Sequence, residues 1–150
     1  MARAIQLSIE GVQSGRGGPF GAVIVREGKI IAEGANQVTS TNDPTAHAEV
    51  MAIRRACEKL GVFELKDCEL YTSCEPCPMC LSAIYWARIR NVFYGNTRKD
   101  AAKIAFDDDE IYREVALPIR KRKLPMKPLL RTEALVAFKE WEKKTDKISY

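Results

Sequence analysis

Four side chains with the chemistry of a catalytic metal site lie in two short segments of this 150-residue chain. The first segment contains His47 and Glu49, and the second contains Cys77 and Cys80. One imidazole and two thiolates suit a tetrahedral zinc ion, and the fourth position is then left for water. Zinc lowers the pKa of its bound water toward neutrality, so hydroxide forms at ordinary pH. The sequence therefore predicts one Zn²⁺ per subunit, with Glu49 as the proton carrier beside the bound water or hydroxide.

Two helix starts are expected to bring these ligands together. The two cysteines are three residues apart, so they share one face of a helix, whose exposed N–H groups stabilise thiolates. Asp43-Pro44 predicts the start of another helix, with His47 in its first turn and an end near Leu60. Positions i and i+2 do not share a helix face, so we expect Glu49 beside the water rather than among the ligands.

Cys74 stands three residues before Cys77 and is an alternative ligand. With Cys74 bound, the site would have four protein ligands and would be structural. Pro76 interrupts the chain between the two cysteines, and Cys74 ends a predicted strand, so we do not expect it to bind. The combined spacing, H-x-E followed by P-C-x-x-C, is typical of zinc-dependent deaminases and favours an open, catalytic site.

The elements that position these residues alternate between helices and strands. Besides the helix that ends near Leu60, the patterns predict helices over residues 2–12, 79–88, 101–115 (interrupted near Asp107) and 132–144, and strands over 20–26, 30–38, 68–73 and 91–94. A basic connector over residues 118–128 has room for a further short strand. This alternation predicts an α/β fold, a three-layer α/β/α sandwich with a central mixed sheet.

Length and composition indicate one globular domain over residues 1–150. The chain is 46% hydrophobic and 29% charged, with a mild net charge of +4 that demands no anionic partner. Its apolar runs are too short to cross a bilayer, and its first residues lack the apolar stretch of a secretory signal. Three of the five cysteines are clustered, which favours metal binding in a reducing compartment. We therefore expect a cytoplasmic protein with no membrane partner.

Over essentially its full length the sequence resembles the bacterial guanine deaminases of the cytidine-deaminase-like superfamily. The zinc motifs are common to that superfamily, whereas Tyr85-Trp86-Ala87-Arg88, Phe106-Asp107-Asp108 and the terminal tyrosine point to guanine. The remaining segments that carry the resemblance are residues 17–25, 42–50 and 71–80. The resemblance implies a zinc-dependent hydrolase that converts guanine to xanthine and ammonia, with a small purine as substrate.

The resemblance also implies which residues contact the base. Asn36 would read the purine edge through its amide, and Phe20 and Trp86 would wall the base pocket. The backbone of Ala48 would lie against the substrate. From the residues alone, other roles stay open: Asn36 suits the turn that follows it, and the two aromatic side chains suit a core.

Asp108 and Tyr150 complete the set implied by the resemblance. Asp108 would contact the base and assist proton transfer, although Asp107–Asp109 before Ile111 is also a good helix cap. Tyr150 would close the site. In relatives of this type the tail comes from the neighbouring subunit. The resemblance therefore implies a homodimer in which a segment of about residues 117–150 is exchanged between subunits.

Three other functions remain as alternatives. A tRNA adenosine deaminase would use the basic residues 120–123 as a phosphate contact, although solvated charge is the commoner meaning of such a run, and nucleic acid is not the partner we expect. A deaminase of another small nucleobase or of an aminotriazine would share the zinc motifs. A non-catalytic zinc-stabilised binding module would have no use for Glu49 and would prefer four protein ligands.

Overall fold

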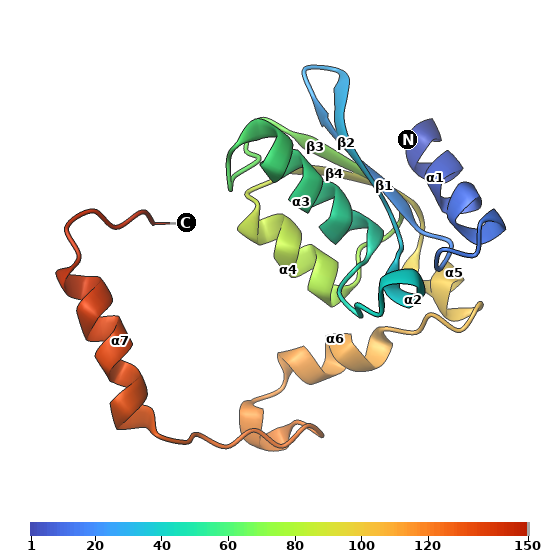
Figure 1. Ribbon diagram of the computed structural model, residues 1–150. Coiled ribbons are helices and arrows are strands. Elements are labelled where there is room, and N and C mark those ends of the chain that lie inside the picture. Colours follow the sequence, from blue (N-terminus) through green and yellow to red (C-terminus); the bar gives the residue numbers. More distant parts are fainter. Residues whose placement is uncertain (150) are drawn as a thin grey trace. The chain divides into compact units, whose positions relative to one another are not determined.

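A mixed four-stranded sheet forms the centre of the computed structural model, which describes residues 1–149 (Figure 1). The strands lie in the order β2 (Lys29–Ala35), β1 (Gly21–Arg26), β3 (Glu69–Cys74) and β4 (Asn91–Asn96). Strand β1 pairs antiparallel with both β2 and β3, whereas β3 and β4 are parallel. Thus the mixed sheet expected from the sequence is confirmed.

Helices cover both faces of this sheet (Figure 1). On one face, α1 (Ala2–Gln13) packs its buried Ala4 and Leu7 against Val23 of β1. On the other face, α3 (Ala48–Leu60) and α4 (Pro78–Trp86) contribute to a larger core around β1 and β3. Successive side chains of a strand point to opposite faces, so β1 serves both cores. The three-layer α/β/α prediction is confirmed.

The predicted start of the third helix was wrong. Helix α3 begins at Ala48, with His47 as its N-cap, rather than at Pro44. The Asp43 carboxylate accepts hydrogen bonds from the backbone N–H of Thr45 at 2.8 Å and from its hydroxyl at 2.7 Å. Asp43 thus closes a local turn, a use of aspartate that competes with helix capping.

The second strand also ends earlier than expected. Strand β2 was expected to run to Val38, but it stops at Ala35. Val38 instead begins the short helix α2 (Val38–Thr41). Later in the chain, the interruption predicted near Asp107 is confirmed, because residues 103–108 separate α5 (Arg98–Ala102) from α6 (Asp109–Ala116).

The chain divides into two compact units, residues 1–109 and 110–150. The second unit contains most of α6, a 3₁₀ turn η1 (Ile119–Lys121) and α7 (Arg131–Lys143). The basic connector over residues 118–128 contains this 3₁₀ turn and forms no strand. None of the described residues after 109 is buried. No described helix is long and apolar enough to span a membrane.

Close packing of α3 on the sheet depends on small residues. Ala48, Ala52 and Ala56 are fully buried and four residues apart, so they form one stripe along the helix. Gly34 of β2 faces this stripe, and a Cβ atom at Gly34 would lie 2.1 Å from the carbonyl oxygen of Ala48. The absence of a side chain at Gly34 therefore sets the distance between α3 and the sheet.

We predict that Gly34→Ala destabilises the protein by about 1–3 kcal/mol, because the added methyl group overlaps backbone atoms that cannot rotate away. Urea unfolding followed by circular dichroism measures this loss. Lys29→Ala, at the exposed start of the same strand, is the control and should leave the unfolding midpoint unchanged. Equal midpoints for Gly34→Ala and wild type would contradict the packing argument.

Candidate metal centre and its cavity

Two helix N-termini bring the three predicted zinc ligands together. His47 is the N-cap of α3 and Cys77 is the N-cap of α4, while Cys80 lies in the first turn of α4. The Nδ1 atom of His47 lies 3.5 Å from the Sγ atom of Cys77 and 3.5 Å from that of Cys80. All three ligand atoms lie within 4.8 Å of one another.

This geometry fits a tetrahedral zinc ion. With Zn–S bonds of about 2.3 Å and a Zn–N bond of about 2.1 Å, tetrahedral angles put the sulfur and nitrogen ligands about 3.6 Å apart. Hydrogen bonds from the Cys80 thiol and His47 lower the pKa of the Cys77 thiol to about 4, whereas the bond to Cys77 raises the pKa of Cys80. Zinc binds cysteine as the thiolate, so Cys77 suits the ion, and binding would release the proton of Cys80.

Glu49 lies beside this cluster in the first turn of α3. It is 5% exposed, and its Oε1 atom accepts a hydrogen bond from the Thr72 hydroxyl at 3.1 Å. Its Oε2 atom lies 3.4 Å from the Sγ atom of Cys80. Burial raises the pKa of Glu49 above the ordinary carboxyl value, which suits a group that takes up and releases protons.

Cys74 stays outside the ligand cluster. Its thiol donates to the backbone carbonyl oxygen of Thr97 at 3.7 Å, and burial raises its pKa to about 11. Among residues 1–149, the group of side chains able to hold a metal ion includes His47, Cys77 and Cys80 but not Cys74. These three side chains would hold the ion, and the fourth position would then be left for water, as the sequence predicts.

A cavity of about 440 Å³ opens next to the cluster, within the size range of small-molecule sites. His47, Glu49 and Cys77 line it. Phe20, Asn36 and Asp108, three of the base contacts implied by the sequence resemblance, line it too. One concave space therefore holds a metal cluster, an aromatic ring, an amide and two carboxyl groups.

The amide of Asn36 is oriented by the backbone around it. Its Oδ1 atom accepts hydrogen bonds from the N–H groups of Gly18 at 3.1 Å and Val38 at 3.3 Å. A Cβ atom at Gly17 would lie 2.5 Å from this Oδ1 atom, so only glycine permits the close approach. Asn36 therefore does serve the local turn, and these two bonds leave the amide nitrogen as a donor for a ligand.

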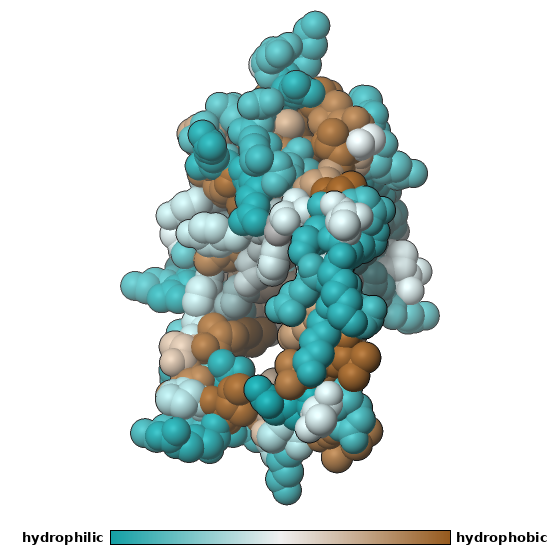
Figure 2. All heavy atoms as spheres, turned by 90° about the vertical axis from the view of Figure 1, so that its left-hand side faces the viewer, coloured by the Kyte–Doolittle hydropathy of each residue, from teal (hydrophilic) through white to brown (hydrophobic). Residues whose placement is uncertain are grey.

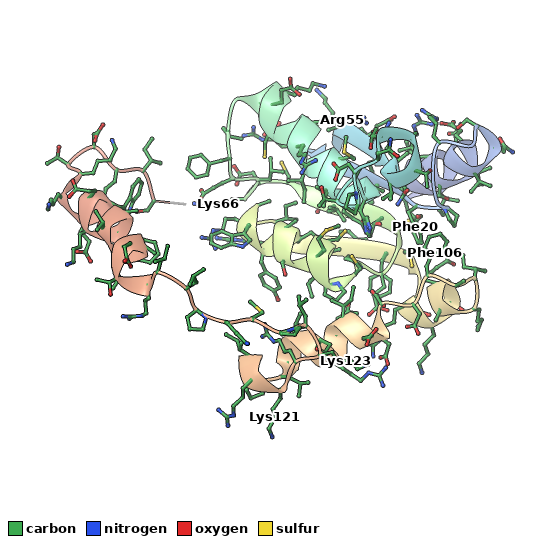
Figure 3. The ribbon with its side chains drawn as sticks, turned by 60° about the horizontal axis from the view of Figure 1, so that its bottom comes forward. Phe20, Arg55, Lys66, Phe106, Lys121 and Lys123 are labelled. Carbon is green, nitrogen blue, oxygen red and sulfur yellow. The ribbon has the colours of Figure 1, made fainter. Side chains whose placement is uncertain are left out.

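An aromatic pair forms part of the cavity wall. The rings of Phe20 and Phe106 meet edge to face, with centroids 4.9 Å apart, and Figure 3 shows them side by side. Ala105, directly before Phe106, has a left-handed backbone with φ of 69°, which is uncommon for a residue other than glycine. Sequence reasoning missed Phe106 as a cavity residue, although it lies two positions before Asp108 in the same segment. It also missed Arg98, for which no motif gave a signal.

Two neighbouring aspartates line the cavity, and they differ in their local environment. Asp107 is exposed, and it accepts a hydrogen bond from the backbone N–H of Asp109 at 2.9 Å, which closes a turn before α6. Asp108 lies half-buried at the cavity. Burial, followed by the negative charge of Cys77, raises the pKa of Asp108. A carboxyl group with a raised pKa is a better proton donor near neutral pH than an ordinary aspartate.

Two of the other expected base contacts, Ala48 and Trp86, are not among the described residues that line this cavity. Ala48 is fully buried at the first position of α3. Trp86 ends α4, is 61% exposed, and lies with its ring centroid 5.8 Å from the guanidinium carbon of Arg88. Tyr150 lies outside the described residues. Their contacts with a substrate stay predictions.

Comparison with known proteins identifies the class of protein. Residues 1–96 match the family model of the cytidine and deoxycytidylate deaminase zinc-binding region. The chain therefore belongs to this family of zinc-binding deaminases. Zinc is accordingly the metal indicated for the His-Cys-Cys cluster.

Full-length similarity narrows the relationship. The guanine deaminase of Bacillus subtilis is 56% identical over 150 residues, which is 100% of this chain and 96% of that protein. An X-ray structure of guanine deaminase from Bacillus subtilis superposes with a TM-score of 0.96, covering 99% of this chain and 95% of the other. The structure of a guanine deaminase from Nitrosomonas europaea has 28% identity and a TM-score of 0.67, over 91% and 69% of the two chains. A tRNA-specific adenosine deaminase from Agrobacterium fabrum is 51% identical over only 77 residues, 51% of each protein.

We predict that the purified protein binds one zinc ion per chain, and that Cys80→Ser binds far less because a thiolate ligand is lost. Cys74→Ser is the matched control and should keep the full zinc content, because its thiol bonds to Thr97 instead. Inductively coupled plasma mass spectrometry measures both. Loss of zinc from Cys74→Ser would point to a closed, four-ligand site.

Proposed function

We propose that this protein hydrolyses guanine to xanthine and ammonia. The observation that carries the proposal is the open three-ligand cluster with buried Glu49 beside it, at a cavity with an amide and a second carboxyl group. The full-length similarity to proteins named guanine deaminases supports guanine as the substrate. A cavity with fixed polar groups suits a purine, because a ligand without matching groups would leave them unpaired.

Glu49 is the proposed proton carrier. A zinc ion held by His47, Cys77 and Cys80 supplies the activation of water that hydrolysis requires. The Oε2 atom of Glu49 takes a proton from the attacking water, which adds to C2 of the base. Glu49 returns this proton to the ring nitrogen. It then takes the remaining proton of the hydroxyl group added at C2 and passes it to the 2-amino group, which leaves as ammonia. The overall balance is guanine plus water to xanthine plus ammonia.

The remaining cavity residues hold the base in this proposal. The amide nitrogen of Asn36 donates to an acceptor on the purine edge, since its oxygen is already bonded to the backbone. The ring of Phe20 packs against the planar base. Asp108 contacts the base and assists the proton transfer to the departing amine, a role that suits a carboxyl group with a raised pKa. From the resemblance, the Ala48 backbone and Trp86 would add contacts around the base.

The alternatives have less support. The match to the tRNA-specific adenosine deaminase of Agrobacterium fabrum covers half of this chain, whereas the match to the Bacillus subtilis guanine deaminase covers all of it. A non-catalytic zinc module would prefer a fourth protein ligand, and the nearby Cys74 thiol bonds to a carbonyl group instead. A reducing, cytoplasmic compartment remains our proposal, because the two cysteine ligands must stay unoxidised to bind zinc.

We predict that Glu49→Gln keeps its zinc but loses about 10²- to 10⁴-fold in kcat, because the amide cannot carry a proton. Ammonia release measures turnover, first on guanine and then on adenine, cytosine, guanosine, aminotriazines and a tRNA anticodon stem-loop. Glu58→Gln, exposed on the same helix, is the control and should match wild type. Wild-type protein that is inert on guanine would overturn the proposed substrate, and an active Glu49→Gln would overturn the proton carrier.

We further propose a homodimer in which about residues 117–150 are exchanged between subunits. None of the described residues after 109 is buried, and this segment exposes Leu129 at 84%, Phe138 at 70% and Trp141 at 45%. Apolar side chains at the surface are visible in Figure 2. A segment of this size cannot bury enough apolar area to fold alone, so these side chains need a covering surface. Tyr150 would then close the site of the neighbouring subunit.

A mixing experiment tests the exchange. We expect Glu49→Gln and Tyr150→Ala each to be nearly inactive alone. In an exchanged mixed dimer, one of the two sites combines an intact Glu49 with an intact Tyr150. Co-expressed random dimers should therefore recover about a quarter of wild-type activity. A monomeric mass near 16.9 kDa in light scattering, or no recovery on mixing, would refute the exchange.

A further inference from the structure

Strand β3 places the side chain of Thr72 on the face of the sheet that packs against α3. Thr72 is 1% exposed, and it points to the same face of the sheet as Leu70, which belongs to the core beneath α3. Its neighbours across the sheet are Ala22 of β1 and Tyr94 of β4, so the strand is held on both sides. Valine has nearly the same shape as threonine and is favoured in strands. Packing alone therefore does not explain why this position has a hydroxyl group.

The hydroxyl group of Thr72 is hydrogen-bonded to Glu49. It donates to the Oε1 atom at 3.1 Å, and a hydroxyl has only one hydrogen to donate. The other carboxylate oxygen, Oε2, lies 3.4 Å from the Sγ atom of Cys80, one of the proposed zinc ligands. The two oxygens of one carboxylate therefore face different partners, the sheet on one side and the ligand cluster on the other.

We infer that Thr72 is a positioning residue, which holds Oε1 of Glu49 against the sheet so that Oε2 faces the reacting water. This inference rests on the proposed function and adds a residue to it. The terminal torsion of a glutamate side chain is broad, so burial alone leaves the carboxyl plane poorly fixed. A hydrogen bond from a central strand fixes that plane, and small errors of placement cost large factors in rate.

The inference assigns no contact with substrate to Thr72. Thr72 is not among the residues that line the cavity, whereas Glu49 is. Loss of the hydroxyl should therefore affect kcat, which depends on the direction of Oε2, and should leave KM unchanged. A purely structural hydroxyl would instead change the melting temperature.

Three variants test this inference on the full-length zinc-loaded protein. Thr72→Val removes the hydroxyl at nearly constant shape, and we expect kcat for guanine to fall about ten- to a hundred-fold, with KM within about twofold of wild type. Thr72→Ser keeps the hydroxyl and should restore most of kcat. Tyr71→Phe is the matched control, because it also removes a hydroxyl of β3 that donates to a glutamate, at 2.8 Å to Glu69, and should leave kcat unchanged.

The kcat values of these variants show whether the Thr72 hydroxyl matters for turnover. An unchanged kcat in Thr72→Val, or an equal loss in Thr72→Ser, would overturn it, since the hydroxyl would then not matter. Zinc content and melting temperature check that each variant is folded, and Thr72→Ala replaces Thr72→Val if the latter does not fold. If wild type is inert on guanine, the proposed function fails instead. Crystal structures of wild type and Thr72→Val then test whether Thr72 orients Glu49. A Glu49 carboxylate with the same orientation in both structures would refute the positioning role.

Discussion

The contact between Gly34 and the backbone of Ala48 is the constraint on which the rest of the site depends. It brings the start of α3 against the sheet, and the residues on either side of Ala48 are His47 and Glu49. One close approach therefore fixes the proposed metal ligand and the proposed proton carrier together. It also allows Glu49 to reach the hydroxyl of Thr72 on β3. Any added atom in this contact would move the whole arrangement.

The cavity is built from positions that come from distant parts of the chain. Gly17 lets the chain pass close to Asn36, and residues 105–108 bring Phe106 and Asp108 to the same space. The groups that line it differ in rigidity and in charge: a buried carboxyl group, a half-buried one and an amide held by two backbone bonds. Burial raises the pKa of both carboxyl groups, so each is suited to exchange protons near neutral pH.

The ligand set and the fold class were predictable because both depend on local spacing. A histidine with a nearby glutamate, and two cysteines three residues apart, carry their chemistry in the sequence itself. The start of α3 was not predictable, because the Asp43 side chain bonds to Thr45 and closes a turn instead of capping a helix. The role of Thr72 was not predictable either, since a buried threonine and a buried valine give the same strand pattern. Its partner lies 23 positions away in the chain.

The neighbouring carboxylates Asp107 and Asp108 carry a consequence for how such sequences diverge. Both residues line the cavity, but Asp107 is exposed and one of its oxygens accepts a bond from the backbone, whereas Asp108 is half-buried. Asparagine at the first position would keep the backbone bond, because its amide oxygen also accepts. At the second position it would remove a half-buried carboxyl group. Substitution should therefore be easier at the first position than at the second, although the two residues are identical and adjacent.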